Sequence, residues 1–224
     1  MTETLPIKVV LLGETAVGKS SFISRFVSDS FLTNHVATMT GCFFSKNVFY
    51  DKVNKEIKYE IWDTAGQERY RSISKMFYQD ASVVLLMLDI TRRDTFEAIK
   101  NYWYSEVKES SPKNVIIAIV ANKSDLYEYE EITNNELEEY AQSINAIYKQ
   151  TSALKNSGIK DLFDQIGYKL LSPDNYEVFI RKTNSRNLIK LTPPKNEEKE
   201  NDADDDADGP KINKTNNKGK KSCC

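Results

Sequence analysis

The stretch GETAVGKSS, residues 13–21, decides the fold, because it follows the apolar run IKVVLL (7–12) and matches the spacing GxxxxGK[ST]. Gly13 and Gly18 allow the backbone to curl until its N–H groups and the start of a helix face an anion. Lys19 would neutralise the β and γ phosphates of a nucleotide, and the Ser20 hydroxyl would take a Mg²⁺ position. The alternative, a glycine turn without function, is disfavoured by the strand before it and the helix after it. The loop predicts a nucleoside triphosphate site without naming the base or the reaction.

Length and composition favour one α/β domain followed by a tail. The chain has 224 residues, of which 40% are hydrophobic, and its net charge of −2 gives no overall attraction to nucleic acid. Three cysteines, two of them at the end of the chain, form neither a disulfide framework nor a metal motif. The sequence lacks a signal peptide and any run of the roughly 18 apolar residues that span a membrane. We expect a cytosolic monomer that binds no nucleic acid, unless a modification attaches it to a membrane.

Apolar runs alternate with helical patterns over residues 1–172, as in βαβ units. We expect strands at 7–12, 42–51, 57–62, 82–90, 114–122 and 146–152. We expect helices that begin near residues 19, 68, 93, 134 and 158. The segments 42–51 and 57–62, joined by DKVNKE, predict a hairpin that adds one antiparallel edge strand. The fold class is therefore α/β of the P-loop NTPase kind, a six-stranded, mostly parallel sheet with helices on both faces.

Residues 173–222 read as a C-terminal tail. The helical pattern decays from residue 173, and from residue 193 the composition is first acidic (NEEKENDADDDADGPK) and then basic and polar (KINKTNNKGKKS). Such segments bury too little apolar surface to offset the entropy of ordering, so we expect disorder at least from residue 193.

The segment IWDTAGQE, residues 61–68, supplies further groups for phosphate chemistry. Asp63 ends an apolar strand, where a carboxylate of a P-loop NTPase holds Mg²⁺. Gly66 offers an N–H that can approach a γ phosphate, and Gln67 has both a donor and an acceptor with which to orient an attacking water.

The segment NKSD, residues 122–125, indicates the base. The Asp125 carboxylate can accept from both N1–H and the 2-amino group of guanine, whereas adenine has neither donor, so adenine would leave the carboxylate unpaired. The Asn122 amide can bond the purine or brace the loop, and the stem of Lys123 can cover one face of the ring. The sequence therefore predicts a guanine nucleotide.

Taken together, GETAVGKS, DTAGQE and NKSD resemble the Ras-like small GTPases over residues 7–172. WDTAGQERYRSI (62–73), LDIT (88–91) and the terminal Cys-Cys resemble the Rab branch. The segment 98–126 looks most like endosomal Rabs, which are favoured, while DSF (29–31) and FFSK (43–46) resemble Golgi Rabs, the alternative. The resemblance implies the small GTPase fold and a switch that binds and slowly hydrolyses GTP, regulates vesicle trafficking and recruits effectors on membranes. It also implies as partners an exchange factor, a GTPase-activating protein, and Rab escort and GDP-dissociation inhibitor proteins.

The resemblance also assigns residues. Thr38 would cover Mg²⁺ and the γ phosphate, Phe31 would lie edge-on to guanine, and Cys223 and Cys224 would carry geranylgeranyl groups. An aromatic surface for effectors would consist of Phe43, Trp62 and Phe77. The catalytic residues are expected to be Gln67, Lys19 and Gly66, and the metal ligands Ser20, Thr38 and Asp63. The residues expected at the nucleotide are Gly13, Ala16, Val17, Gly18, Lys19, Ser20, Ser21, Phe31, Thr38, Gly66, Asn122, Lys123, Asp125, Ser152 and Ala153.

The chain departs from the Rab pattern at Thr40, where glycine is usual, and at Leu154, which replaces the lysine of TSAK. Because neither change removes a phosphate or magnesium ligand, we expect an active GTPase. No motif assigns an arginine to the γ phosphate, so turnover should be slow unless a partner supplies one. The alternatives are a hydrolysis-deficient GTP-binding scaffold and a P-loop ATPase or kinase. Cys42 reads as a small buried residue on a strand.

Overall fold

The computed structural model describes residues 4–31, 41–64 and 77–171. Its strands are β1 (Thr4–Leu12), β2 (Cys42–Tyr50), β3 (Lys55–Asp63), β4 (Val83–Asp89), β5 (Ile116–Asn122) and β6 (Ile147–Gln150). Its helices are α1 (Lys19–Ser28), α3 (Arg93–Ala98), α4 (Tyr104–Ser110), α5 (Asn134–Ser143) and α6 (Ile159–Leu171). A π-helical turn, Ile99–Trp103, joins α3 to α4, and short 3₁₀ turns occupy Asp51–Val53 and Ser124–Tyr129. The helix expected near residue 68 falls outside the described residues.

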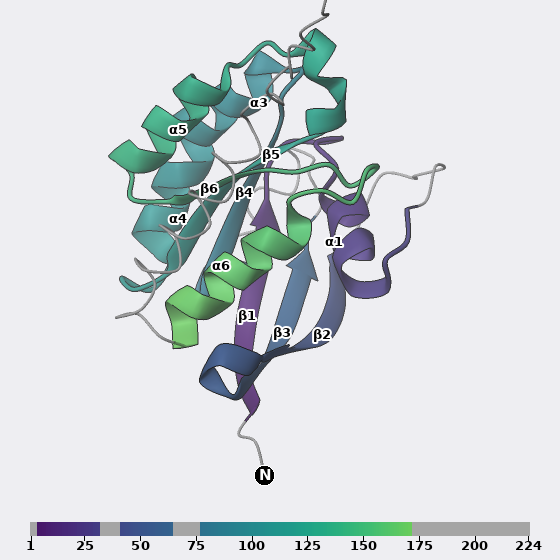
Figure 1. The fold of residues 1–224 in the computed structure, drawn as a ribbon. Coiled ribbons are helices and arrows are strands. Elements are labelled where there is room, and N and C mark those ends of the chain that lie inside the picture. The colour runs from purple at the N-terminus through teal and green to yellow at the C-terminus, as the bar shows by residue number, and fades with distance from the viewer. Residues whose placement is uncertain (1–3, 32–40, 65–76, 172–224) are drawn as a thin grey trace, which may run out of the picture.

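The strands form one six-stranded sheet in the order β2-β3-β1-β4-β5-β6. β1 pairs in parallel with β3 and β4, and β5 pairs in parallel with β4 and β6, while β2 runs antiparallel to β3 at one edge. α1 and α6 cover one face, and α3, α4 and α5 cover the other (Figure 1). The expected fold class and the hairpin at the edge are confirmed.

β1 begins at Thr4, three residues before the expected strand at residue 7. Over Thr4–Lys8 the strand pairs with β3, and its register with β4 begins only at Val9. Pro6, which has no N–H, therefore lies where β1 has one strand neighbour, a place that tolerates proline. The apolar pattern did not reveal this extension because TLP is not an apolar run.

The central strands divide their side chains between two cores. Alternate residues of β1 and β4 point to opposite faces, so Val9 and Leu85 pack beneath α1 and α6 while Val10 and Leu86 pack beneath α3, α4 and α5. This explains why β1, β4 and β5 read as nearly continuous apolar runs.

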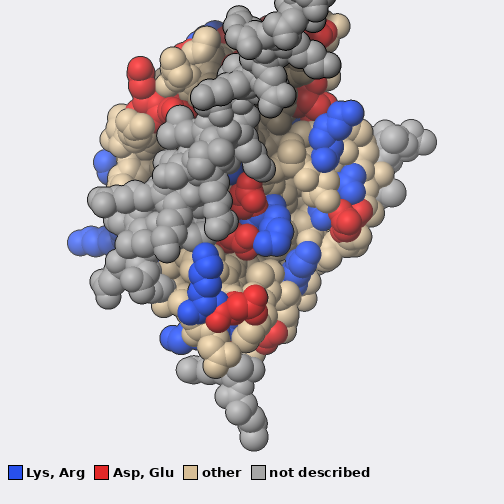
Figure 2. Space-filling view, viewed as in Figure 1, with Lys and Arg blue, Asp and Glu red and all other residues tan. Residues whose placement is uncertain are grey.

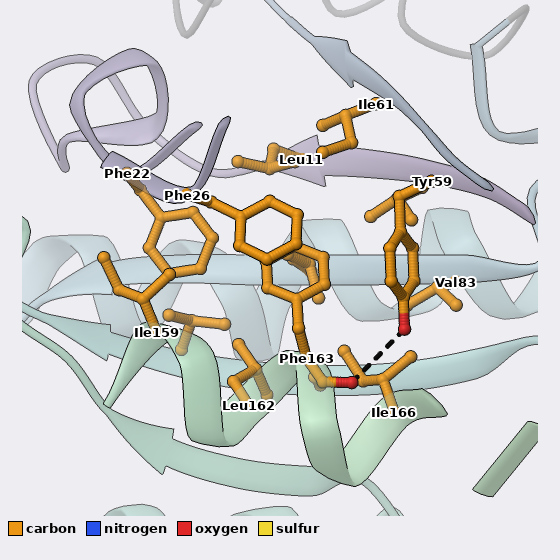
Figure 3. Close-up of a cluster of buried hydrophobic side chains, with 14 of the residues drawn as sticks. Leu11, Phe22, Phe26, Tyr59, Ile61, Val83, Ile159, Leu162, Phe163 and Ile166 are labelled. Atoms are coloured by element: carbon orange, nitrogen blue, oxygen red, sulfur yellow. Dashed lines mark hydrogen bonds between the residues drawn. The ribbon is translucent and has the colours of Figure 1, made fainter. Parts of the chain in front are cut away.

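Aromatic rings fill the core beneath α1 and α6 (Figure 3). Phe26 of α1 stacks on Phe163 of α6, with ring centroids 3.5 Å apart, and Tyr59 of β3 meets Phe163 edge-on at 5.0 Å. The Tyr59 hydroxyl donates to the Phe163 carbonyl oxygen at 3.2 Å, and the Tyr50 hydroxyl donates to the same oxygen at 2.9 Å. α6 is thereby attached to the sheet by both apolar packing and hydrogen bonds.

Cys42 is exposed, which corrects the expectation that it would be buried. It opens the edge strand β2, which pairs only with β3 among the described strands, and most of β2 is exposed or half-buried. The sequence pattern of a strand does not show whether the strand lies at the edge of the sheet, where such a position is exposed, or inside the sheet, where it is covered.

The face that carries α6 has basic and acidic side chains side by side (Figure 2). Lys160 pairs with Asp164 at 2.7 Å along α6, and Lys149 of β6 pairs with Asp161 at 3.2 Å. Among the helices that the structure describes, none is long and apolar enough to cross a membrane.

Candidate nucleotide site

Four strand ends bring the predicted site residues to one edge of the sheet. β1, β3, β4 and β5 are mutually parallel, so their carboxyl ends lie at the same edge. Leu11 is in register with Asp63, and Asp89 is in register with Asn122. The loop 13–18 leaves this edge between β3 and β4, the two neighbours of β1, where open α/β sheets bind ligands.

The phosphate loop, residues 13–20, requires its glycines. Gly13 has φ 144°, and a Cβ there would lie 2.3 Å from the Met87 carbonyl oxygen. Gly18 has φ 96°, and a Cβ there would lie 2.4 Å from Asn122 Nδ2. Ala16 has φ 66°, a conformation that L residues other than glycine seldom adopt. The loop is therefore curled as an anion cradle requires, and α1 begins within its last two residues, at Lys19.

Lys19 is nearly buried, with 6% of its surface exposed. Its Nζ donates to the carbonyl oxygens of Gly13 at 2.8 Å and Glu14 at 2.9 Å. Burial lowers the pKa of Lys19 to about 8, and this effect outweighs the attraction of Asp63 and Glu14, which acts in the opposite direction. The ammonium group thus lies in a site that lacks sufficient negative charge, and the phosphates of a nucleotide would supply it.

Ser20 and Asp63 meet at the mouth of the loop. Ser20 Oγ donates to Asp63 Oδ2 at 2.5 Å, and Asp63 is 2% exposed. Asp63 Oδ1 is buried without a hydrogen-bond partner among the described residues. Burial raises the pKa of Asp63, although the Ser20 hydrogen bond and Lys19 oppose the shift. A hydroxyl beside a carboxylate with an unused buried oxygen fits a Mg²⁺ ion, which prefers such hard oxygen ligands.

The guanine loop, residues 122–125, is joined to the phosphate loop by Asn122. Asn122 Nδ2 donates to the Val17 carbonyl oxygen at 2.8 Å, and Asn122 Oδ1 accepts from Thr151 Oγ1 at 3.2 Å. Asn122 is therefore a brace in this structure, one of the two roles that the sequence left open.

The remaining residues of the guanine loop are held by side chains from other elements. Lys123 has φ 62° and its Nζ pairs with the buried Asp89 Oδ2 at 2.5 Å. Ser152 Oγ donates to Asp125 Oδ1, and the Ala153 carbonyl oxygen accepts from Arg25 Nε at 2.9 Å. The segment NKSD and the residues Ser152 and Ala153, all expected at the nucleotide, are thus brought together.

Leu154, the departure from the usual lysine, is 49% exposed. Phe31 is half-buried against the core, and the Arg25 guanidinium lies 6.0 Å from its ring centroid.

The three aromatic residues predicted as an effector surface lie together. The rings of Phe43 and Trp62 are 5.2 Å apart, and those of Trp62 and Phe77 are 5.6 Å apart. Phe43 is 51% exposed.

Five predicted residues, Thr38, Gly66, Gln67, Cys223 and Cys224, lie outside the described residues.

Sequence reasoning missed four residues that hold the loops in place. They are Thr64, whose Oγ1 donates to the Leu11 carbonyl oxygen at 2.6 Å, together with Asp89, Arg92 and Trp103. Arg92 Nη1 donates to the Thr15 carbonyl oxygen at 3.0 Å, and Trp103 Nε1 donates to Glu14 Oε1 at 3.1 Å. The sequence contained one hint, since Asp89 ends a strand at the ligand edge and Arg92 follows three residues later.

Comparison with known proteins agrees with this geometry. Residues 8–172 match the model of the Ras family. The chain is 42% identical to human Ras-related protein Rab-22A over 168 residues, which cover 75% of this chain and 85% of that protein. It is 41% identical to human Ras-related protein Rab-31 over 76% of this chain and 86% of that protein. It is 37% identical to Ras-related protein RABF2a of Arabidopsis thaliana over 73% of this chain and 80% of that protein. The chain belongs to the Ras family and is a Rab-type small GTPase, an enzyme that binds guanine nucleotide, hydrolyses GTP and regulates membrane trafficking.

Proposed function

We propose that this Rab-type GTPase works as a Mg²⁺-dependent switch in which Ser20, Asp63 and Thr38 hold the metal. The observation that carries the proposal is the buried Asp63 Oδ1 without a hydrogen-bond partner in the described part of the chain, beside the Ser20 hydroxyl. When bound, Mg²⁺ would neutralise charge on the β and γ phosphates of GTP. The metal would also offset the cost of burying the Asp63 carboxylate, because it supplies the charge that burial otherwise leaves uncompensated.

The residues of the chain itself then position the reactants. The loop N–H groups and the Lys19 ammonium hold the phosphates, Gly66 offers an N–H to the γ phosphate, and Gln67 orients the attacking water. Little covalent chemistry is required of the protein in phosphoryl transfer, so placement and charge determine the rate.

Recognition of guanine would come from the loops after β5 and β6. Asp125 accepts from the base, Lys123 covers one ring face, and Ser152, Ala153 and Phe31 complete the pocket. Support comes from the bonds Ser152–Asp125 and Lys123–Asp89, which fix the positions of these side chains.

Thr38 and Gly66 would contact the γ phosphate of GTP. Effectors would then recognise the GTP-bound state at the surface of Phe43, Trp62 and Phe77. An exposed aromatic surface is a common anchor for a protein partner. The partners that we propose are effectors, an exchange factor, a GTPase-activating protein, and escort and GDP-dissociation inhibitor proteins.

We further propose that residues 1–172 form the GTPase domain and that residues 173–222 link it to a membrane through geranylgeranyl groups on Cys223 and Cys224. Two lipid chains meet the requirement for stable anchoring. The site of action would be the cytoplasmic face of endosomal membranes, in exchange with the cytosol.

The test is single-turnover hydrolysis of GTP loaded on the full chain, with and without Mg²⁺. We expect slow release of phosphate with Mg²⁺, and a loss of at least about tenfold in nucleotide affinity on removing it. Asp63→Asn should lose this Mg²⁺ dependence, whereas the matched variant Asp80→Asn, at an exposed position, should keep it. Equal affinities with and without Mg²⁺ in the wild-type protein would overturn the metal proposal.

A hydrolysis-deficient scaffold predicts tight GTP binding and no phosphate release, even with cell extract.

A further inference from the structure

Two adjacent arginines after β4 extend to opposite parts of the molecule. Arg92 Nη1 donates to the Thr15 carbonyl oxygen of the phosphate loop at 3.0 Å. Arg93 instead forms two hydrogen bonds of 2.8 Å with the carboxylate of Glu136 on α5. The pair therefore offers a matched comparison, since the residues have the same charge and neighbouring positions but only Arg92 contacts the nucleotide site.

The carboxylate of Asp94 fixes the orientation of the Arg92 guanidinium. Arg92 Nη2 pairs with Asp94 Oδ2 at 2.6 Å and its Nε donates to Asp94 Oδ1 at 3.3 Å. Its backbone N–H donates to the Asp89 carbonyl oxygen at 3.0 Å. With two of its donor groups held by one carboxylate, the planar guanidinium directs its remaining nitrogen toward Thr15.

The peptide that Arg92 contacts is the one that precedes Ala16. In a planar trans peptide the carbonyl oxygen and the following N–H point in opposite directions. A donor on the Thr15 oxygen therefore sets the direction of the Ala16 N–H, which points away from Arg92. In phosphate loops, N–H groups on the side away from such outer contacts meet the phosphates.

Ala16 itself gives a reason for such an anchor. Its φ of 66° lies in the left-handed region, which is less favourable for an alanine than its preferred conformations. Glycine would adopt this conformation without that cost. A loop with alanine here needs contacts from outside to stay in the binding geometry. Trp103, in the π-helical turn that follows α3, provides another such contact to the neighbouring residue Glu14, because its Nε1 donates to Glu14 Oε1 at 3.1 Å.

We infer that Arg92 is a positioning residue of the phosphate loop, which holds the Thr15 carbonyl oxygen and thereby aims the Ala16 N–H at a phosphate of the bound nucleotide. The inference rests on the proposed binding of the nucleotide phosphates by residues 13–20. It supplies an arginine in cis that acts on the outer side of the loop, rather than on the γ phosphate itself.

The experiment compares the full-length wild-type protein with Arg92→Ala and Arg93→Ala, each loaded with Mg²⁺ and nucleotide. The first readout is the single-turnover rate of GTP hydrolysis, and the second is the amide proton resonance of Ala16 in the GDP form. We expect Arg92→Ala to slow hydrolysis about three- to tenfold, a modest loss because the contact is partly exposed to solvent. The Ala16 amide should also move upfield, since its hydrogen bond to phosphate weakens. Arg93→Ala should stay within about twofold of the wild-type rate, with an unmoved Ala16 amide.

Asp94→Ala is the second variant, because it removes only the carboxylate that orients Arg92. It should shift the Ala16 amide in the same direction as Arg92→Ala by a smaller amount. Arg92→Lys, which keeps one donor and the charge, should restore most of the hydrolysis rate.

The inference is wrong if Arg92→Ala and Arg93→Ala give the same rate and the same Ala16 resonance. It is also wrong if Arg92→Ala does not load nucleotide and Asp94→Ala leaves the Ala16 amide unmoved. A wild-type protein that binds no GTP would instead overturn the proposed nucleotide site, and the inference with it.

Discussion

Asn122 and Val17 connect the two loops that would recognise opposite ends of a guanine nucleotide. The Asn122 amide donates to the Val17 carbonyl oxygen at 2.8 Å, although 105 residues separate them in the chain. Both residues are buried, and Gly18 next to Val17 has no room for a side chain because the same amide occupies the space.

Asn122→Ala should accelerate the release of GDP. The substitution leaves the buried Val17 oxygen without its donor, at a cost of about 1–3 kcal/mol, which corresponds to roughly 5- to 150-fold in the dissociation constant. Release of a fluorescent GDP analogue measures the change. Asn47→Ala, at an exposed position of β2, is the control and should release GDP at the wild-type rate. Equal rates for the two variants would contradict the brace.

Asp89→Asn should loosen the guanine loop without affecting hydrolysis in the loaded complex. Asp89 is 1% exposed and pairs with Lys123, so the variant removes a charge-assisted bond and leaves the Lys123 ammonium with a neutral partner. We expect GDP release to be about tenfold faster, at an unchanged single-turnover rate of GTP hydrolysis. Asp80→Asn is the exposed control. A parallel fall in the hydrolysis rate would indicate that Asp89 also acts on the phosphate loop.

Binding of GDP should take up protons near pH 8. The pKa of Lys19 is about 8 in the nucleotide-free protein, and the phosphates should raise it again. At pH 8 Lys19 therefore gains about half a proton on binding, and at pH 6.5 almost none. Calorimetric titration in buffers of different ionisation enthalpy measures this number. An apparent binding enthalpy that does not depend on the buffer at pH 8 would refute the prediction.

The lowered pKa of Lys19 should also make the stability of the nucleotide-free protein depend on pH. The pKa of Lys19 lies below its ordinary value of 10.5, so between about pH 8 and 10.5 the unfolded chain binds more protons than the folded one. The contribution of Lys19 to the free energy of unfolding of the nucleotide-free protein should then increase with pH in this window. Lys19→Met should remove that contribution, which urea unfolding at pH 8 and pH 10 would measure.

Gly167→Ala should destabilise the domain, although alanine is the better helix former. A Cβ at residue 167 would lie 2.1 Å from Cζ and Oη of Tyr50, which is buried and bonded to Tyr59 and Phe163. The gain in helix propensity of about 1 kcal/mol is smaller than the combined cost of overpacking and lost hydrogen bonds, so the free energy of unfolding should fall by about 2–4 kcal/mol. Urea unfolding at saturating GDP and Mg²⁺ measures it. Lys160→Ala, on the exposed side of α6, should change it by less than about 0.5 kcal/mol.

Much of the fold could be predicted because its signals are local. Nearly continuous apolar runs mark β1, β4 and β5 as covered strands, and the helical spacing after Gly158 marks α6. The positions of the phosphate loop and the guanine loop followed in turn, because parallel strands place their carboxyl ends at one edge. Cys42 shows where such reasoning fails, since burial depends on whether a strand lies at the edge of the sheet.

The sequence by itself determined the succession of strands and helices along the chain, the glycine-dependent loop and the type of base. These depend on residue type and spacing along a short stretch. Only the tertiary structure decided that Asn122 contacts Val17, that Lys123 pairs with Asp89 and that Arg92 reaches Thr15. These pairs are 105, 34 and 77 residues apart, so the order of strands in the sheet and the packing of helices on it bring them together. A side chain's type limits the bonds that it can form, whereas its partner is whichever group the fold places within about 3 Å.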